Sequence, residues 1–446
     1  MKRDLRPGRF LVWSLATLLW ANAGSAAQVW SGFQGDAAHD GYVPGNFNPA
    51  HFSAARQVSF NVPEAQQLTP AVAGNGAVFL VQSSYEYTPS FLFAYNSHTG
   101  SSLWTASIGT KNQTGNYLYG VSPAGYGDGN VYVETENNTS SGPASLIDFN
   151  GANGQIIFSS PLSAQYDAVG GPTIFNGNVY GQNGYFGGLS AFNSTTGAQS
   201  WYTSVPQQSG WSVAADSHDL YLYMGDGSGS PGPSPGRLYA INRATGSIDY
   251  QILDPRSNSS DALMNPTLGP NSDAFVISGY PYFTNGSRLI GFDLANHVIS
   301  WQRQATTTNG YTGDIALANG RLYTEDSGIL TVLDENSGSQ LWTWTPGAGQ
   351  SLFGNLIVTD SAVFVSSGSG IYAIDLQTHL PVWSTSFSGT LSMADNMLFA
   401  VGQNSLHAYS LGTPVPEPPT MQLAIAVAIF LLPALRRLKR CSQTPI

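Results

Sequence analysis

The sequence predicts an all-β protein, an eight-bladed β-propeller of four-stranded antiparallel blades, and three observations support this fold class. First, an Asn or Asp followed eight residues later by a large aromatic residue recurs roughly every 40–55 residues, which indicates a repeat architecture. Second, alternating strand-like segments surround each copy, and no long helical period separates them. Third, 50 glycines, 12% aromatic and only 10% charged residues are typical of a turn-rich β protein. Because propellers are large single domains, the 446 residues do not require several domains.

The repeated phrase has seven complete copies, and each is interpreted as a β-hairpin. The copies pair Asn96 with Trp104, Asn150 with Phe158, Asn193 with Trp201, Asn242 with Tyr250, Asp293 with Trp301, Asp334 with Trp342 and Asp375 with Trp383. The Asn or Asp side chain can bond backbone groups two residues on, which starts a turn. A glycine four residues before the aromatic closes the turn in five copies, and His297 and His379 replace it in two. Histidine is among the few non-glycine residues that tolerate positive φ.

The number of blades follows from the strands that precede each hairpin. In the sixth unit these are residues 314–317 and 321–324, so each unit holds four strands. Complete units begin near Pro70, Gly120, Gly170, Gly210, Asn265, Thr312 and Ser351. An eighth unit, residues 391–411, lacks its last strand, and we expect residues 56–62 to supply it and close the ring, since closure removes an exposed edge. Seven blades is the alternative count.

The phrases at residues 92–104, 189–201 and 238–246 resemble the pyrroloquinoline-quinone (PQQ)-type propeller repeat. That family includes quinoprotein dehydrogenases and the propeller lipoprotein of the outer-membrane β-barrel assembly machinery. The resemblance covers roughly residues 28–412 and implies that the seven aromatic residues dock neighbouring blades. It also implies that residues 30–36 form a lead-in packed on the propeller.

The resemblance gives little support for catalysis. The family's quinone enzymes hold PQQ in the central funnel beside a Ca²⁺, an aspartate base and a disulfide of adjacent cysteines. Here the only cysteine is Cys441 in the C-terminal tail, and neither a CxxCH haem motif nor a calcium-loop run of Asp and Asn is present. We therefore expect no cofactor, neither PQQ nor Ca²⁺. The rival hypothesis is a quinoprotein-like or carbohydrate-active enzyme with its site in the central channel. The missing lipidation cysteine argues against identity with the assembly lipoprotein.

The two ends of the chain are predicted to be targeting signals. Residues 1–27 have the basic, apolar and small-residue regions of a secretory signal peptide. Residues 413–446 combine Pro416, Glu417 and Pro418 with an apolar helix at about 421–435 and the basic residues Arg436, Arg437, Lys439 and Arg440. This order resembles the PEP-CTERM sorting signal, which implies processing by an exosortase. A plain C-terminal membrane anchor is the alternative. In both cases the basic tail stays cytoplasmic and the propeller is exported.

The charge of the predicted propeller restricts its partners. Residues 28–415 contain eight basic and 25 acidic residues, a balance of −17. Such a surface repels phosphate backbones and argues against nucleic acid. We therefore expect a non-enzymatic module of the cell envelope or extracellular matrix that binds protein or polysaccharide.

Overall fold

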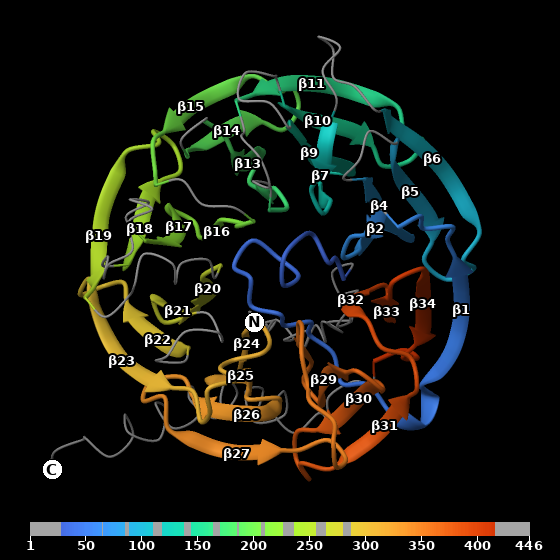
Figure 1. Ribbon diagram of the computed structural model, residues 1–446, viewed down its shortest axis with the longest axis vertical. Coiled ribbons are helices and arrows are strands. Elements are labelled where there is room, and N and C mark those ends of the chain that lie inside the picture. Colours follow the sequence, from blue (N-terminus) through green and yellow to red (C-terminus); the bar gives the residue numbers. More distant parts are fainter. Residues whose placement is uncertain are drawn as a thin grey trace, which may run out of the picture.

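The chain forms a closed ring of eight β-sheet blades around a central axis (Figure 1). The computed structural model describes residues 28–64, 66–84, 89–109, 118–137, 144–163, 170–184, 187–206, 210–225, 236–255, 265–279 and 287–414. Each blade runs from a short strand at the channel to a longer strand at the circumference (Figure 1). The predicted eight-bladed, four-stranded architecture is confirmed.

The strands follow the chain blade by blade. Blade 1 holds β2 (Gln66–Leu68) and β3 (Val72–Gly74), which share one inner position, then β4 (Ala77–Ser84), β5 (Ser90–Asn96) and β6 (Ser102–Gly109). Blade 2 likewise holds β7 (Leu118–Val121) and β8 (Gly125–Gly127), then β9 (Asn130–Asn137), β10 (Ala144–Asn150) and β11 (Ile156–Leu162). Blade 3 holds β12 (Thr173–Phe175), β13 (Asn178–Gln182), β14 (Leu189–Asn193) and β15 (Gln199–Thr203). Blade 4 holds β16 (Ala214–Ala215), β17 (Asp219–Met224), β18 (Gly236–Asn242) and β19 (Ile248–Asp254).

The second half of the ring continues in the same order. Blade 5 holds β20 (Thr267–Gly269), β21 (Asp273–Ser278), β22 (Arg288–Asp293) and β23 (Val298–Gln304). Blade 6 holds β24 (Ala316–Ala318), β25 (Arg321–Asp326), β26 (Ile329–Asp334) and β27 (Gln340–Trp344). Blade 7 holds β28 (Ile357–Val358), β29 (Ala362–Ser367), β30 (Gly370–Asp375) and β31 (Pro381–Thr385). Blade 8 holds β32 (Thr390–Ala394), β33 (Met397–Val401) and β34 (Ser405–Ser410).

The fourth strand of blade 8 comes from the start of the propeller. Strand β1 (Ser53–Ser59) follows the short 3-10 helix η1 (Pro49–His51) and pairs antiparallel with β34. It begins and ends three residues before the expected span 56–62. The chain leaves the sheet after Ser59, although the backbone N–H of Phe60 still donates to the carbonyl of Asn404 at 2.8 Å.

The repeated hairpin carries the same irregularity in blades 1 to 7. The pairing between the third and fourth strands shifts by one residue just before the Asn or Asp, as between Ala94 and Tyr95 in blade 1. This β-bulge re-aims the strand. It places Trp104 opposite Ala94, a small residue that leaves room for the ring.

The core lies between the blades. Eight hydrophobic clusters are found among the described residues, and each combines two neighbouring blades. The second strand of every blade contributes a buried aromatic at its third position: Phe79, Tyr132, Tyr180, Tyr221, Phe275, Tyr323, Phe364 and Phe399. Because no blade buries its faces alone, the ring is stable only as a whole.

The predicted signal segment 1–27 lies outside the described residues, as does the sorting segment from residue 415 on. Within the described part of the chain, no helix has the length and apolar character needed to cross a bilayer.

Candidate functional site

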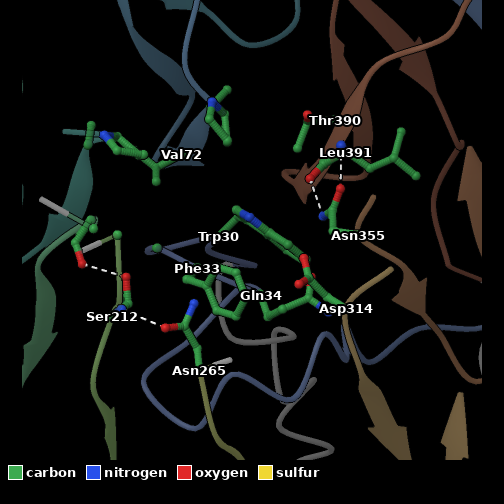
Figure 2. Close-up of a pocket in the computed structure, with 18 residues that line it drawn as sticks. Trp30, Phe33, Gln34, Val72, Ser212, Asn265, Asp314, Asn355, Thr390 and Leu391 are labelled. Carbon is green, nitrogen blue, oxygen red and sulfur yellow. Dashed lines mark hydrogen bonds between the residues drawn. The ribbon is translucent and has the colours of Figure 1, made fainter. Parts of the chain in front are cut away.

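The central channel is the first candidate, because all eight blades contribute to it. A cavity of about 200 Å³ lies on the axis (Figure 2). Its walls come from the residues just before or within the inner strands, and several are Gly, Ala or Pro. Asp314 is the one ionisable side chain among the described residues that line it.

The lead-in closes one end of this channel. The lead-in extends beyond the expected residues 30–36 to Val43. Its backbone forms hydrogen bonds with the inner strands of blades 1, 2, 4, 5, 6 and 7: Trp30 with Ala73, Ser31 with Tyr126, Ala37 with Ala215, Ala38 with Leu268, Asp40 with Leu317, and both Gly41 and Val43 with Val358, all at 2.7–2.9 Å. Trp30, Phe33 and Gln34 project against the cavity (Figure 2). The lead-in therefore plugs the channel and ties the ring together.

Most polar side chains at the cavity are occupied by blade-to-blade hydrogen bonds (Figure 2). The Asn355 amide of blade 7 donates to the carbonyl of Leu391 and accepts from its N–H, both at 2.8 Å. The backbone N–H of Ser212 donates to Asn265 Oδ1 at 2.7 Å. These side chains hold neighbouring blades in register and have little capacity left for a ligand.

A pair of acids in blade 6 is the exception. Burial raises the pKa of Asp314 to about 7. Glu325 is fully buried, and neither carboxylate oxygen has a hydrogen-bond partner. Burial and then the charge of Asp314 raise the pKa of Glu325 well above its usual value. Gly313 makes room, because a Cβ there would lie 2.4 Å from Glu325 Oε2. The pair can store protons, but a cavity of this size is below the roughly 300–1,000 Å³ of small-molecule sites.

A second hollow lies on the face that carries the turns between first and second strands. Lead-in residues 31–42 and the inner turns of blades 3 to 6 enclose about 640 Å³. The described lining includes Asp36, Asp40, Asp216 and Glu335 and no Lys or Arg. We call it the acidic groove. Burial, and then the charge of Asp36, raises the pKa of Asp40 to about 7.

A third hollow of about 1,100 Å³ lies on the opposite face, over blades 7, 8 and 1. Its lining is rich in amides and hydroxyls: Gln66, Gln67, Gln403, Asn404, Ser386, Ser388, Thr390 and Ser405. Phe353 is 44% exposed at its wall, and Phe387 stacks on His407 with ring centroids 3.6 Å apart. Glu64 is the single ionisable residue of the described lining. We call this hollow the amide groove.

The described residues also hold a cluster of His218, Asp219 and Asp249 at the rim of blade 4. The Nδ1 atom of His218 lies 2.8 Å from Asp219 Oδ1 and 3.9 Å from Asp249 Oδ2. His218 and Asp249 are exposed, and Asp249 also accepts from Asn242 and Ser247. These contacts within blade 4 explain, without invoking a metal, why the three side chains lie close together.

The repeat aromatics all lie between blades. Trp104, Trp201 and Trp301 donate from Nε1 to the carbonyls of Gly151, Arg243 and Glu335 in the next blade at 2.9–3.0 Å. Each ring covers the closing glycine of that blade's turn: a Cβ on Gly246 would lie 2.7 Å from Trp201. Phe158 covers Gly197 in the same way.

The two histidines that replace this glycine do more than adopt positive φ. His297 and His379 have φ values of 56° and 58°. Their rings stack on Tyr250 and Trp342, with centroids 3.7 and 4.2 Å apart. Trp383, the seventh aromatic, meets Phe52 edge to face instead.

Sequence reasoning missed Arg56 and the residues of the grooves. Arg56 lies opposite Ala408, the position an aromatic takes in other blades, and its Nε donates to the carbonyl of Thr99 in blade 1 at 2.9 Å. The sequence could have indicated this role, because β1 completes the eighth repeat and Arg56 takes the position of its aromatic residue. The sorting residues Pro416, Glu417 and Pro418 and the basic residues Arg436, Arg437, Lys439 and Arg440 lie outside the described residues.

Comparisons with solved structures support the fold. The BamB of Moraxella catarrhalis superimposes with a TM-score of 0.54 at 14% identity, over 80% of this chain and 97% of that one. A europium-containing methanol dehydrogenase gives 0.60 at 10% identity, over 86% and 98%. The computationally designed Ika8 protein gives 0.57 at 12% identity, over 79% and 98%. At these identities the likeness concerns the fold alone.

Sequence comparison identifies the family. A curated relative, the outer membrane protein assembly factor BamB of Taylorella asinigenitalis, is 34% identical over 83 residues. That match covers 18% of this chain and about a fifth, 21%, of the relative. The family model for outer membrane protein assembly factor BamB matches residues 89–344. Since that match spans more than half of the sequence, this chain belongs to the BamB-like family of PQQ-type propellers.

Proposed function

We propose that this chain is an exported, non-enzymatic propeller that binds a neutral polysaccharide of the cell envelope or matrix in the amide groove. The observation that carries the proposal is the chemistry of that groove. It is large, about 1,100 Å³, and almost free of charge in a propeller with a balance of −17.

Sugars present hydroxyl groups at their edges and apolar C–H faces. Exposed amides such as those of Gln67, Gln403 and Asn404 can both donate to and accept from hydroxyls. Phe353 offers a partly exposed ring at the wall for an apolar sugar face. Gly354 and Gly368 also line the groove and leave space for a polymer, since an added Cβ would meet nothing within 4 Å at Gly354 and only Phe353 at 3.9 Å at Gly368. This set of groups suits a neutral glycan better than a charged one.

The central channel supports the non-enzymatic part of the proposal. PQQ carries three carboxylates, and the described residues lining the cavity include no Lys or Arg to pair with them. Asp314 lines the cavity and Glu325 lies close to it, so ionised carboxylates here would repel the carboxylates of the cofactor. Trp30 and Gln34 of the lead-in occupy part of the space. The residues present do not suit PQQ. A rise in the thermal midpoint on adding PQQ with Ca²⁺ would instead favour a quinoprotein-like enzyme.

Family membership supports an envelope location, and the sequence signals refine it. We infer export by residues 1–27, insertion in the inner membrane by the apolar helix near 421–435, and processing by an exosortase at Pro416–Pro418. Measuring the mass of the mature C-terminus tests this route. An intact tail in the exported protein would contradict processing.

Affinity electrophoresis in gels with neutral or anionic envelope polysaccharides tests the groove. We expect retardation by the neutral polymer and about fivefold weaker binding for Phe353→Ala, since loss of one aromatic contact costs on the order of 1 kcal/mol. Leu380→Ala is the matched control, because Leu380 is an apolar side chain 61% exposed away from the groove. Equal effects of the two substitutions, or no retardation by the neutral polymer, would count against the proposal.

A second candidate function is a scaffold for envelope proteins, which the family name favours. The outer strands carry exposed apolar residues just before the aromatics, among them Leu103, Ile157, Leu341 and Val382. Charge substitution at Leu341 should then abolish capture of envelope proteins and leave polysaccharide binding intact. Capture that survives this substitution would exclude the outer strand of blade 6 as the docking surface.

A further inference from the structure

The junction between blades 5 and 6 brings two carboxyl groups together. Asp273 is the first residue of β21, and Glu335 follows the turn residue Asp334 of blade 6. Both side chains lie over Gly269: a Cβ there would be 2.0 Å from Asp273 Oδ1 and 3.0 Å from Glu335 Oε1. Asn271 Nδ2 donates to Glu335 Oε1 at 3.1 Å. Three oxygen-bearing side chains therefore converge where a glycine leaves room for them.

The other seven junctions serve as internal comparisons, because the ring repeats the same geometry. The residues equivalent to Asp273 and Glu335 are Ala77 and Gly151, Asn130 and Ser194, Asn178 and Arg243, Asp219 and Leu294, Arg321 and Leu376, Ala362 and Leu411, and Met397 and Ser97. None of these described pairs combines two acids. Acids that reach this region elsewhere have polar partners: Ser97 donates to Asp395 at 3.0 Å, Ser194 donates to Asp128 at 3.1 Å, and Asp219 Oδ1 lies 2.8 Å from His218 Nδ1.

The acids at blades 5 and 6 are only partly satisfied in this way, because Glu335 Oε1 accepts from Asn271 but two other oxygens have no partner. Glu335 is only 1% exposed, and its Oε2 atom has no hydrogen-bond partner. Asp273 Oδ1 is likewise buried without a partner. Glu335 also lines the acidic groove, which gives an ion and its waters a path to the pair. Buried carboxylates are normally paired or coordinate metals.

We propose that Asp273 and Glu335 bind a hard divalent cation, best matched by Ca²⁺, at the floor of the acidic groove. Calcium takes six to eight oxygen ligands in flexible geometry. Two carboxylates supply up to four, rotation of the Asn271 amide presents a fifth, and waters from the groove complete the shell. The ion links β21 of blade 5 to the turn after β26 of blade 6 and so fastens this junction.

This site differs from the calcium site that the sequence argued against. That expectation concerned a contiguous run of Asp and Asn and the central funnel. Here the ligands come from two blades and are 62 positions apart along the chain, so no local motif signals them. Two acids alone are not a metal motif in sequence. Their convergence and the two unpartnered oxygens indicate the site.

Terbium luminescence provides a direct test, because Tb³⁺ replaces Ca²⁺ and is sensitised by nearby tryptophan. Trp301 is the reporter, since its Nε1 donates to the Glu335 carbonyl at 3.0 Å. The full-length protein in detergent, stripped of metal at pH 7.5, should show tryptophan-excited Tb³⁺ emission that Ca²⁺ displaces. We expect a Kd for Ca²⁺ on the order of 10⁻⁴–10⁻³ M, the range of extracellular sites. Trp301→Phe should reduce the emission while calorimetry still detects Ca²⁺ binding.

Substitutions separate this site from other acidic clusters. Asp273→Asn and Glu335→Gln should each weaken Ca²⁺ binding at least tenfold, and Gly269→Ala should do so without removing a charge. Asp249→Asn, in the exposed cluster of blade 4, is the matched control and should bind normally. If a variant fails to fold, the remaining two still decide the result.

The competing state is a proton shared between the two acids. Burial, and then the neighbouring Glu335, raises the pKa of Asp273 to about 7 in the cation-free protein. The metal would be tested up to about 10 mM, roughly tenfold above the weakest Kd of extracellular sites. If calorimetry then shows no heat of Ca²⁺ binding and no Tb³⁺ emission appears, the cation site is overturned in favour of the shared proton. Binding lost in Asp249→Asn and retained in Asp273→Asn would overturn it as well.

Discussion

Replacing Gly246 by alanine tests the inference that the turn glycine serves the aromatic of the preceding blade as well as its own backbone. Gly246 has a φ of +75°, and an added Cβ would lie 2.7 Å from Trp201 and 2.9 Å from Thr203 Oγ1. Gly76 has a φ of +79°, and a Cβ added there would meet nothing within 4 Å. The two glycines therefore share the backbone requirement and differ in the ring contact.

The expected costs follow from that difference. A non-glycine residue in the left-handed region costs about 1–2 kcal/mol, which applies to both positions. Overpacking adds about 1–3 kcal/mol at Gly246 alone. We expect Gly76→Ala to lower the free energy of unfolding by about 1–2 kcal/mol and Gly246→Ala by about 2–5 kcal/mol. Partial exposure of Trp201, which lets the ring move, favours the lower part of that range.

Urea unfolding followed by far-ultraviolet circular dichroism measures both variants against the parent protein. A double-mutant cycle with Trp201→Ala isolates the ring contact, because Gly246→Ala on that background keeps the backbone cost and the contact with Thr203 and loses only the ring's share. Equal destabilisation by Gly76→Ala and Gly246→Ala, within about 0.5 kcal/mol, would refute the reasoning, since differences of that size lie within ordinary non-additivity. An unchanged cost of Gly246→Ala without the tryptophan would do the same.

Three further predictions concern the channel and the closure. An acid whose pKa is higher in the folded than in the unfolded state makes the protein less stable as pH rises above the unfolded pKa. Asp314→Asn should therefore flatten the fall in stability between about pH 4 and pH 7, and Glu325→Gln should lessen the fall above about pH 4. Both variants should match the parent protein near pH 4 and exceed it at pH 8 in thermal unfolding. Arg56→Ala removes the bond to Thr99 and should cost about 1 kcal/mol in urea unfolding. Trp30→Ala, at a side chain only 2% exposed, should cost about 3–5 kcal/mol and increase access of small solutes to the channel, measured by quenching of tryptophan fluorescence.

The fold was predictable because its signals are local. The Asn or Asp that starts each turn and the glycine that closes it lie within five residues of each other, and turn chemistry acts over that range. The closing strand was predictable because an incomplete repeat leaves an unpaired edge. Its limits were off by three residues, since strand ends depend on pairing with β34, which local pattern does not specify.

The candidate site was much less predictable, because its parts meet only in space. The lead-in holds six blades through backbone hydrogen bonds, which leave no mark in side-chain identity. The interpretation of His379 was incomplete for a related reason: positive φ is local, but stacking on Trp342 depends on the preceding blade. The amide groove joins residues 62–68 to residues 353–405 only once the ring has closed.

In a ring of repeats, each position can be compared with its equivalents in the other blades. Function is to be sought at the positions that differ from those equivalents. Departure alone is insufficient evidence: Arg56 replaces an aromatic, yet its bond to Thr99 explains it fully as part of the closure. Asp273 and Glu335 depart from seven equivalent pairs and also leave buried oxygens without partners, so structure alone does not explain them. The amide groove departs in charge from the acidic surface around it. The residues that break the repeat without a structural cause are therefore the ones to substitute first.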